Sequence, residues 1–448
     1  MTGLRVDSFP EIVAADVAVI GAGPGGIAAA VSAAERGLRV VVVDRGLEAG
    51  GQIWRRKAGA AAAPEAQPWL TRLADSSART INGASVVDVR PDAGGFEILV
   101  ESSGRPLRIW AADIVLATGA RELFIPFDGW TLPGVMGIGG TQALLKSGAS
   151  FAGKRVVIAG SGPLMLPVAA SLADAGAKLL LVAEQAGRAA VARFASGLWK
   201  TPGLLLQAAK YRVRFLSARY ATGTWVTAAQ GGDRLESISI TDGHHTWRED
   251  LDVLCTGYGL IPNVEIARLI GCEIRDGAIA VDNRQRTNVN HVLAVGEATG
   301  IGGAPLSLIE GSIAGSTVGS VETASGHLSR RRASLVEAAD RMLEVFAPRA
   351  ELRSLPHADT IVCRCEDVTY GAIQGAACAR QAKLYTRVGM GPCQGRTCMP
   401  SLDFLLAWQA DTVRPPVEPA LVSVLSSEVA DEAASLFPLT SSVGEAYQ

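Results

Sequence analysis

A strand–loop–helix–strand pattern near the start of the chain restricts its fold more than any other stretch. A continuously apolar segment is followed by three glycines at G-x-G-x-x-G spacing, Gly21, Gly23 and Gly26. A helix of small residues comes next, and a second apolar segment ends in Asp44. Apolar strands of this kind are typical of parallel sheets, which are buried on both faces. The pattern therefore predicts a βαβ unit in an α/β protein.

The spacing gives each of these residues a physical role. Gly21 allows a tight turn out of the strand, Gly23 lets a pyrophosphate approach the backbone, and Gly26 lets the helix pack closely on the strand. The helix N-terminus offers unpaired N–H groups to phosphates, and Asp44 stands where a carboxylate accepts hydrogen bonds from a ribose. The unit thus predicts a dinucleotide site. A glycine-rich turn that binds nothing is the alternative, and the complete order of strand, loop, helix and acid argues against it.

A second, altered copy of this plan occupies residues 153–184. It keeps two glycines and an acid at the end of its second strand, namely Gly160, Gly162 and Glu184. Met165 stands in place of the third glycine, and Pro167 interrupts the first turns of the helix. A long side chain hinders the close helix–strand contact, and a proline constrains the turn that should face phosphates. We therefore expect a second nucleotide-fold unit that does not use NADH as reductant, with an adenine nucleotide on Glu184 left open as its ligand.

The charge balance argues against binding of nucleic acid. The 448 residues include 42 basic and 44 acidic side chains, a formal net charge of −2, so no basic excess favours polyanions. No N-terminal segment has the layout of a secretory signal, and the longest apolar runs contain the glycines of the nucleotide loop. The sequence therefore predicts a cytoplasmic protein, with a peripheral position on the inner membrane left open.

Four of the seven cysteines form two close pairs, Cys363 with Cys365 and Cys393 with Cys398. Four thiolates are a complete ligand set for a [2Fe–2S] cluster, and they can also hold a tetrahedral zinc ion. The C-x-C spacing of the first pair favours iron–sulfur, because zinc sites usually use C-x2–4-C. Four unrelated buried cysteines are the other alternative, against which the clustering argues. No C-x-x-C occurs, so disulfide reductase chemistry is not expected.

The order of motifs along the chain resembles the two-dinucleotide-binding-domain flavoprotein family. These motifs are G-A-G-P-G-G, Gly51-Gln52, A-T-G at 117–119, the second G-x-G, and A-V-G-E at 294–297. In that family the first unit binds FAD, the A-T-G strand lies against it, and an acid contacts the ribityl chain. The usual acid is Asp, so Glu297 departs from the pattern by one methylene. The resemblance implies an FAD site made of Gly21, Gly23, Pro24, Gly25, Gly26, Asp44, Arg45, Gly51, Gln52, Thr118, Gly119, Gly296 and Glu297.

The cysteine segments V-C-R-C-E-D-V-T and G-M-G-P-C-Q-G-R-T-C resemble the small [2Fe–2S] domain of bacterioferritin-associated ferredoxin. With the flavoprotein body they are more similar to the larger flavin subunit of heteromeric amino-acid and opine dehydrogenases. This group includes opine oxidases, D-hydroxyproline dehydrogenase, hydrogen cyanide synthase and dye-linked L-proline dehydrogenases. The motifs are specific to the group and not to one substrate. The resemblance implies four cluster ligands, Cys363, Cys365, Cys393 and Cys398.

The same resemblance implies an electron-transfer role. A beta-type partner subunit with a second flavin would oxidise an amino acid, an imino acid or an opine, and a small third subunit is a further candidate partner. Electrons would pass through flavin, with FMN as a candidate at the subunit interface, and the cluster to a quinone or an electron carrier. Flavin handles two electrons and the cluster one, so together they split a hydride into single-electron steps. An NAD(P)H-dependent flavin reductase and a non-enzymatic electron-transfer or iron-delivery module are the alternatives.

The motifs divide the chain into an FAD domain interrupted by the second nucleotide unit, a cluster domain and a tail. The FAD domain is expected in two parts, and the tail is expected to pack on a neighbouring element. The boundaries that we expect are 1–120, 121–285, 286–350, 357–410 and 411–448.

Apolar residues at helical spacing predict an amphipathic helix over 334–346. Three arginines precede it, Arg330, Arg331 and Arg332. A run of like charges is typical of a solvated helix face, so we expect all three to point to solvent. Residues 348–357 are interpreted as a linker to the cluster domain.

Overall fold

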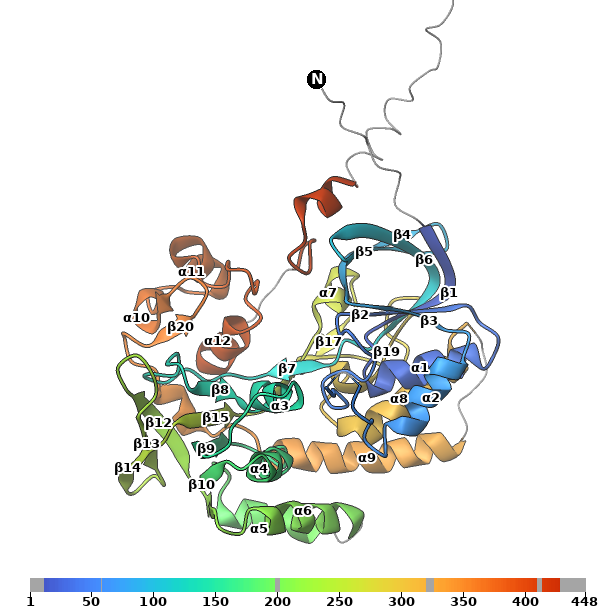
Figure 1. The fold of residues 1–448 in the computed structure, drawn as a ribbon. Helices are drawn as coiled ribbons and strands as arrows, with labels where there is room; N and C mark the ends of the chain where they lie inside the picture. Colours follow the sequence, from blue (N-terminus) through green and yellow to red (C-terminus); the bar gives the residue numbers. More distant parts are fainter. Residues whose placement is uncertain (1–11, 58, 198–201, 320–325, 409–412, 428–448) are drawn as a thin grey trace, which may run out of the picture.

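Two parallel-stranded sheets form the body of the molecule (Figure 1). The computed structural model describes residues 12–57, 59–197, 202–319, 326–408 and 413–427. Each sheet is covered by helices, as expected for α/β units, and a small third region lies beside them. The start of the chain and the end of the predicted tail lie outside the described residues.

The first sheet has the strand order β3-β2-β1-β6-β5-β4, with β19 paired to β6. Strands β1, β2, β3, β6 and β19 run parallel, and β4 and β5 continue the sheet antiparallel. Ile20 pairs with Val43 and with Leu116, so the loops after three strands meet at the carboxyl edge, where such sheets bind ligands. The strands are β1 (Ile12–Ile20), β2 (Val40–Asp44), β3 (Arg79–Asn82), β4 (Ala84–Asp92), β5 (Gly95–Ser102), β6 (Arg105–Leu116) and β19 (Val292–Ala294).

The second sheet repeats the parallel plan in the order β11-β10-β9-β15-β8, and β12, β13 and β14 form an antiparallel sheet of their own. The two predicted nucleotide-fold units are therefore confirmed as fold elements. The strands are β8 (Val135–Gly137), β9 (Arg155–Gly160), β10 (Lys178–Glu184), β11 (Arg219–Thr222), β12 (Trp225–Gln230), β13 (Ser237–Thr241), β14 (Thr246–Asp250) and β15 (Val253–Gly257). Two short pairs complete the body, β7 (Ala120–Glu122) with β16 (Leu260–Pro262), and β17 (Ile274–Arg275) with β18 (Ala278–Ile279).

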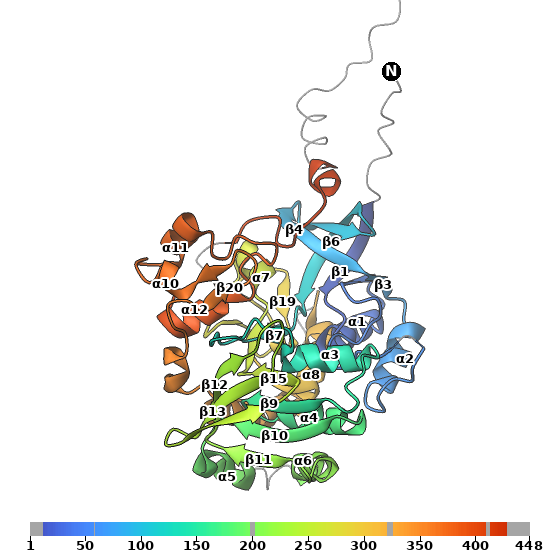
Figure 2. The same ribbon diagram turned by 60° about the vertical axis from the view of Figure 1, so that its left-hand side comes forward.

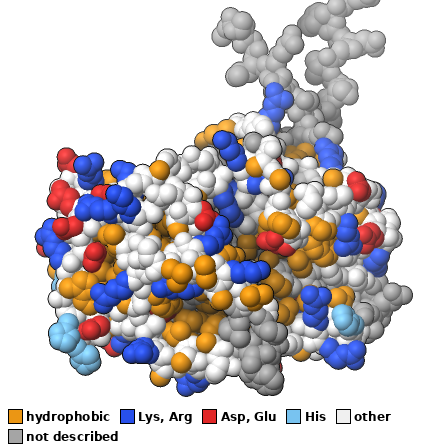
Figure 3. Space-filling view, turned by 60° about the horizontal axis from the view of Figure 1, so that its bottom comes forward, with side chains coloured by type: hydrophobic (Ala, Val, Ile, Leu, Met, Phe, Trp, Pro, Cys, Tyr) orange, Lys and Arg blue, Asp and Glu red, His pale blue; other side chains and the backbone are white. Residues whose placement is uncertain are grey.

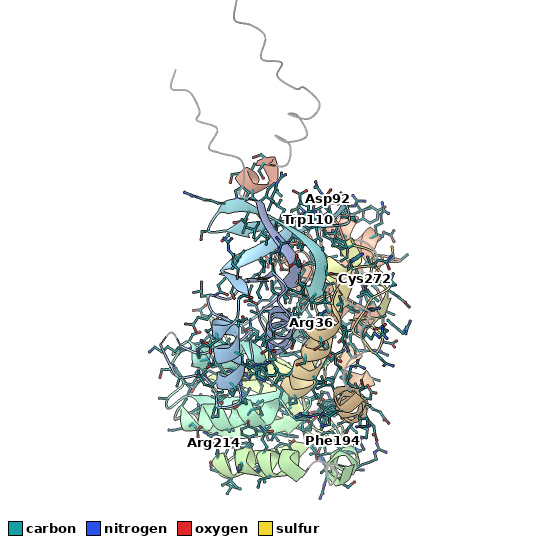
Figure 4. The ribbon with its side chains drawn as sticks, turned by 90° about the vertical axis from the view of Figure 1, so that its right-hand side faces the viewer. Arg36, Asp92, Trp110, Phe194, Arg214 and Cys272 are labelled. Atoms are coloured by element: carbon teal, nitrogen blue, oxygen red, sulfur yellow. The ribbon has the colours of Figure 1, made fainter. Side chains whose placement is uncertain are left out.

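Helices α1 and α8 of the first unit pack tightly against each other. A Cβ on Gly315 would lie 2.3 Å from the Ala29 oxygen, so no side chain fits there. Arg36, labelled in Figure 4, donates to the carbonyls of Gly315 (3.0 Å) and Val318 (2.7 Å) at the end of α8. The body helices are α1 (Pro24–Ala34), α2 (Gln67–Asp75), α3 (Ile138–Lys146), α4 (Met165–Asp174), α5 (Arg188–Gly197), α6 (Pro202–Arg214), α7 (Glu265–Leu269), η2 (Gly296–Ala298), α8 (Gly303–Thr317) and α9 (Gly326–Val345).

A small domain with its own core follows α9. Its buried apolar residues include Val362, Ile373, Val388 and Leu402, and Figures 1 and 2 show it beside the second unit. Helix α9 begins at Gly326, earlier than predicted. None of the helices in the described part of the chain is long and apolar enough to cross a membrane. The elements of this region are η3 (Ala350–Ser354), β20 (Ile361–Cys363), β21 (Val368–Thr369), α10 (Tyr370–Ile373), α11 (Ala379–Thr386) and α12 (Cys398–Leu406).

The described C-terminal segment, residues 413–427, returns to the first sheet. Val417 N donates to Val87 O at 2.9 Å. Val424 is buried against Val87 and Leu99 of β4 and β5. The part of the tail that the structure describes thus packs on a neighbouring element, as the sequence led us to expect.

Candidate functional site

The three glycines of the first loop have different surroundings. Gly21 has φ +107°, and a Cβ there would lie 2.2 Å from the Ala117 oxygen. A Cβ on Gly26 would lie 1.8 Å from the Gly21 oxygen. These two positions exclude a side chain because strand, loop and helix touch there. A Cβ on Gly23 would meet no protein atom within 4 Å, so this glycine borders open space in which a pyrophosphate can lie.

Helix α1 begins at this loop with its positive end free of acidic groups. Gly23 is its N-cap with extended backbone, Pro24 lies in the first turn, and no side chain caps the helix. The first turn holds no acid, so no side chain of that turn competes with a phosphate for its amides. Gly51 crosses the loop closely, since its Cβ would lie 2.9 Å from the Gly23 Cα. The arrangement suits the pyrophosphate of a dinucleotide.

Asp44 ends β2 beside the glycine loop. Its Oδ2 accepts a hydrogen bond from Ala22 N at 2.6 Å, and its Oδ1 accepts one from Gly46 N at 2.6 Å. These bonds hold the half-buried carboxylate at the carboxyl edge of the sheet. Each oxygen keeps a lone pair that can accept from a ribose hydroxyl.

Four more of the predicted site residues lie along the same edge. A Cβ on Gly25 would lie 3.6 Å from the Gly296 Cα, so α1 and η2 meet there. Thr118 Oγ1 donates to Asn263 O at 2.6 Å. Gly119 has φ +68°, and a Cβ on it would meet nothing within 4 Å. The structure thus brings the glycine loop, the A-T-G turn and the late glycine together around one open edge.

Arg45 and Gln52 contact other side chains of the protein. Arg45 Nη1 lies 3.0 Å from Glu418 Oε1 in the C-terminal segment. Gln52 Oε1 accepts a hydrogen bond from Arg55 at 3.3 Å. Their contact with FAD stays a prediction.

Glu297 has a buried oxygen that lacks a partner. Its Oε1 accepts a hydrogen bond from Gly303 N at 2.7 Å, whereas Oε2 is buried and has no hydrogen-bond partner among the described residues. Burial raises the pKa of Glu297, the Gly303 bond lowers it, and the charge of Glu310 raises it further. A buried unsatisfied oxygen costs free energy, and a ligand hydroxyl can supply the missing donor. The residues present therefore fit a ribityl chain at this place.

A buried ion pair behind this site was not predicted. Glu310 on α8 accepts hydrogen bonds from Gly296 N and from Arg332, both at 3.0 Å. The expectation that all three arginines point to solvent is wrong for Arg332, whose side chain is 20% exposed and pairs with a carboxylate that is 3% exposed. The reason is that α9 packs on α8, so one arginine of the run faces inward. The acid within a small-residue helix was the signal available in the sequence.

Arg332→Met is expected to lower the free energy of unfolding by about 3–5 kcal/mol, because it leaves the buried Glu310 charge unpaired. Burial raises the pKa of Glu310 and Arg332 lowers it, so the variant binds a proton there more readily. A carboxyl whose folded pKa is raised loses stability as the pH rises, so the deficit should grow as the pH rises above the ordinary glutamate pKa. Urea unfolding measures both effects. Arg331→Met changes an exposed neighbour and should cost under about 0.5 kcal/mol; equal losses in the two variants would contradict the buried pair.

The two cysteine segments lie against each other. The thiol of Cys393 contributes to the raised pKa of Cys365, and the thiol of Cys363 contributes to the raised pKa of Cys398. Cys363 and Cys398 are buried, and Cys365 is exposed. Two adjoining thiol pairs match a binuclear cluster, in which each iron takes two cysteines. Among the described residues, no three His, Cys, Asp or Glu side chains form a group that could hold a metal ion, and the ligand assignment stays a prediction.

The backbone around Cys393 favours thiolate at that residue, whereas burial raises the pKa of Cys365 and of Cys398. A Cβ on Gly391 would lie 2.2 Å from the Cys365 Cβ, so only glycine allows the two segments to approach. Burial raises the pKa of Cys393, but hydrogen bonds from the Thr397 and Gly395 amides and from Cys365 outweigh it, and its pKa lies below the usual thiol value. Metal ligation requires thiolate. The chemistry of the donor set thus fits a cluster.

Arg121 connects the flavin edge to the cluster loop, and it was not predicted. It lies on β7, directly after the A-T-G turn. Its Nη1 donates to Asn263 Oδ1 at 2.6 Å, and its Nε donates to Arg396 O at 3.0 Å. Asn263 in turn donates to Thr118 O at 2.8 Å. The loop that carries the second cysteine pair is therefore tied to the strand end that is predicted to lie against the flavin.

The second nucleotide loop differs from the first in how its helix begins. Helix α1 starts directly after Gly23, but α4 starts at Met165, three residues after Gly162. Two amides of this loop bond within the turn, because Met165 N donates to Gly162 O at 3.3 Å and Leu166 N donates to Pro163 O at 3.1 Å. Met165 itself is completely buried. Fewer amides are left to face a phosphate than in the first unit.

Glu184 is closed to a ribose. Its side chain is 0% exposed, and its oxygens accept hydrogen bonds from Gly162 N and Ala186 N, both at 2.8 Å. Burial raises the pKa of Glu184 to about 7, although the Ala186 and Gly162 bonds oppose the shift. The buried carboxylate offers a ribose no accessible surface in this structure, and an adenine nucleotide at Glu184, which the sequence left open, stays a prediction.

Two family models match the chain. The model described as pyridine nucleotide-disulphide oxidoreductase matches residues 15–327, and the model described as a BFD-like [2Fe-2S] binding domain matches residues 361–408. The first indicates FAD or NAD binding, and the second indicates a [2Fe–2S] cluster. Together they account for both regions in which the site residues lie.

Similar proteins include subunits of larger enzymes. An opine oxidase subunit of Rhizobium meliloti (strain 1021) is 31% identical, covering 93% of this chain and 98% of the relative. Hydrogen cyanide synthase subunit HcnB of Pseudomonas aeruginosa is 30% identical, covering 85% of this chain and 90% of the relative.

Solved structures agree in fold. The L-proline dehydrogenase from P. horikoshii has a TM-score of 0.64 at 18% identity, covering 94% of this chain and 81% of that chain. The thioredoxin reductase from T. acidophilum has a TM-score of 0.54 at 23% identity, covering 67% of this chain and 96% of that chain. At these identities the likeness concerns the fold alone. The two family models and the two relatives carry the assignment. They show that the chain belongs to the pyridine nucleotide-disulphide oxidoreductase family, as an oxidoreductase subunit of the flavin and [2Fe–2S] type.

Proposed function

We propose that this chain is the electron-transfer subunit of a heteromeric dehydrogenase. A partner flavin subunit oxidises an amino acid, an imino acid or an opine, and this chain passes the electrons on. The observation that carries the proposal is Arg121, which joins the Thr118 strand end, through Asn263, to the loop between Cys393 and Cys398. The names of two relatives, hydrogen cyanide synthase subunit HcnB and an opine oxidase subunit, support a role within a larger enzyme.

The residues of the chain bind and orient the two cofactors. Gly23 and the α1 N-terminus receive the pyrophosphate of FAD, Asp44 binds the ribose, and Glu297 accepts from the ribityl chain. The four paired cysteines hold the cluster. Bound flavin supplies two-electron chemistry and the cluster supplies one-electron chemistry. Arg121 keeps the cluster loop in a fixed position relative to the flavin edge.

Substrate oxidation is assigned to the partner because the acids at the flavin edge are already engaged. Glu122 on β7 accepts hydrogen bonds from Gly139 N (2.7 Å) and Gly140 N (3.1 Å) at the start of α3. Glu297 is buried and bound to Gly303. A general base must turn toward the proton that it removes, and backbone amides hold both carboxylates in place. FMN at the interface with the partner, a small third subunit, and a quinone or electron carrier as acceptor complete the proposal.

Exposed apolar side chains support contact with a protein partner. Leu206, Val213 and Leu216, on α6 and just after it, are 59%, 63% and 64% exposed. Figure 3 shows apolar side chains interleaved with lysine and arginine over this side of the molecule. Apolar surface rimmed by polar residues marks protein contacts. This side is therefore a candidate contact surface for the partner.

The runner-up is an NAD(P)H-dependent flavin reductase that feeds its own cluster. The match to a pyridine nucleotide family favours it. The altered start of α4 and the buried Glu184 argue against it.

Purification of the chain with its bound partner, followed by an activity screen, tests the proposal. The screen measures dye reduction with opines, proline, hydroxyproline, sarcosine and glycine, and with NADH in parallel. We expect one of the amino compounds to drive dye reduction at least about tenfold faster than NADH, a difference of ~1.4 kcal/mol in activation free energy. Faster reduction with NADH than with every amino compound would favour the reductase instead.

A further inference from the structure

We propose that the chain's own segment Phe346–Arg349 lies in the nucleotide loop of the second unit in place of a dinucleotide. The segment determines specificity, because it excludes pyridine nucleotides from a fold that would otherwise bind them. It also anchors the linker that leads to the cluster domain. Exclusion of nucleotides from the second unit does not depend on which substrate or partner the complex uses.

Three backbone groups of the segment bond to the loops that follow β9 and β10. Ser161 Oγ donates to Phe346 O at 2.7 Å, and Gln185 Nε2 donates to Ala347 O at 2.9 Å. Arg349 N donates to Gln185 Oε1 at 3.0 Å. Gln185 Nε2 also donates to Ser161 Oγ at 2.9 Å. In a dinucleotide-binding unit these two loops contact the pyrophosphate and the ribose, so the segment takes up the polar groups that a nucleotide would need.

The side chains of the segment fill the remaining space. A Cβ on Gly162 would lie 3.7 Å from Phe346, so the ring stands directly over the second glycine of the loop. The ring also packs edge-on against Phe194 of α5, with the centroids 5.0 Å apart; Figure 4 labels Phe194 on the lower part of the molecule. Arg349 lies 3.7 Å above the ring of Trp225, within the range of a cation–π contact.

Burial shows how completely the segment closes the loop. Glu184 and Gln185 are 0% and 2% exposed, and Ser161 is 9% exposed. Asp44, at the end of the corresponding strand of the first unit, is only half-buried, although it also accepts two backbone hydrogen bonds, from Ala22 N and Gly46 N. The two acids therefore share a structural role, and the first alone remains accessible to a ligand.

The same contacts fix the path of the chain to the cluster domain. Directly after Arg349, η3 contributes Leu352 to the buried core of the second unit, and Leu355 joins the same core. His357 and Thr360 then bond to Asp128 before the first cysteine segment begins. The loops that follow β9 and β10 thus provide the first of several contacts that hold the linker to the body.

Nucleotide titration of the full-length, FAD-loaded chain tests the exclusion directly. Calorimetric titration with NADH, and separately with ADP-ribose, should show no binding at millimolar ligand. Micromolar binding of either compound to the wild-type chain, at one site beyond FAD, would overturn the proposal. This readout involves neither substrate nor partner, so its outcome is independent of the electron-transfer role.

Limited proteolysis tests the anchoring. Ser161→Ala combined with Gln185→Ala removes side-chain bonds to the segment, and we expect cleavage within residues 346–357 to become about tenfold faster. The control is Ser171→Ala combined with Gln207→Ala, which removes the same groups from α4 and α6, where they bond only within their own helices. FAD absorbance and circular dichroism establish that each variant is folded. Equal cleavage rates in the test and control variants would contradict the anchoring, and a test variant that fails to fold leaves the nucleotide titration of the wild-type chain as the deciding experiment.

Discussion

Gly23→Val is expected to give a folded chain that retains almost no FAD. A side chain at this position meets no protein atom within 4 Å, so the fold tolerates it. The same space is where a pyrophosphate must approach the backbone, and valine fills it. Loss of phosphate hydrogen bonds worth about 3 kcal/mol corresponds to a decrease of roughly a hundredfold in affinity.

The measurement is the ratio of flavin absorbance to protein after purification, with circular dichroism as the check on folding. Gly232→Val is the matched control, because Gly232 is an exposed loop residue whose Cβ also meets no atom within 4 Å. Gly26→Val gives a useful contrast, since its Cβ would lie 1.8 Å from the Gly21 oxygen and the chain should misfold. A Gly23→Val protein that holds a full complement of FAD would refute the site.

Cys363→Ser is expected to abolish the cluster while FAD remains bound. Cys363 is buried in the core of the small domain and interacts with Cys398, so a serine there removes one of four ligands from the interior of the site. A hydroxyl is a poor substitute for a thiolate toward iron–sulfur clusters. The glycine loop lies in a separate domain from the four cysteines, so FAD binding should not change.

Iron, acid-labile sulfide and the visible charge-transfer bands beneath the flavin spectrum measure the cluster under anaerobic conditions. Cys378→Ser is the control, because Cys378 is an exposed cysteine of the same domain outside the two pairs. We expect that variant to keep both cofactors. One zinc and no sulfide in the wild-type protein would show that the cysteines hold a different metal, and a full cluster in Cys363→Ser would remove this residue from the ligand set.

The first nucleotide unit could be predicted from the sequence because its determinants are local. An apolar strand, three glycines and a terminal acid lie within 30 residues, and each has a separate steric or electrostatic role. The alteration of the second unit was also visible, since Met165 stands where the helix must approach the strand. In the structure, this alteration takes the form of a helix α4 that begins only at Met165.

The closure of the second unit by the chain itself could not be predicted. Phe346 and Gln185 are 161 residues apart in the sequence. Phe346 ends the apolar pattern of the predicted helix over 334–346, but that pattern does not identify the surface that the ring contacts. The carbonyls of Phe346 and Ala347 also take part, and backbone groups leave no trace in the sequence. The burial of Glu184 could not be predicted for the same reason, because the remote segment that covers it is not encoded near Glu184.

The contacts that hold the small domain against the body also could not be predicted from the sequence. The spacing of the cysteines predicted a domain and its ligand set, because the pattern lies within 36 residues. The link from Arg121 to the carbonyl of Arg396 joins residues 275 positions apart. Arg332 was assigned to solvent because a run of arginines usually faces water, and the packing of α9 on α8 turned one of the three inward.

Anaerobic reduction of the isolated, FAD-loaded chain, compared with the complete complex, tests whether the partner subunit oxidises the substrate. The substrate found in the screen is added to each, the flavin absorbance and the electron paramagnetic resonance signal of the cluster are followed, and turnover is measured with an artificial electron acceptor. We expect the substrate to reduce flavin and cluster in the complex and to leave both oxidised in the isolated chain. Turnover by the isolated chain at the rate of the complex would contradict this expectation.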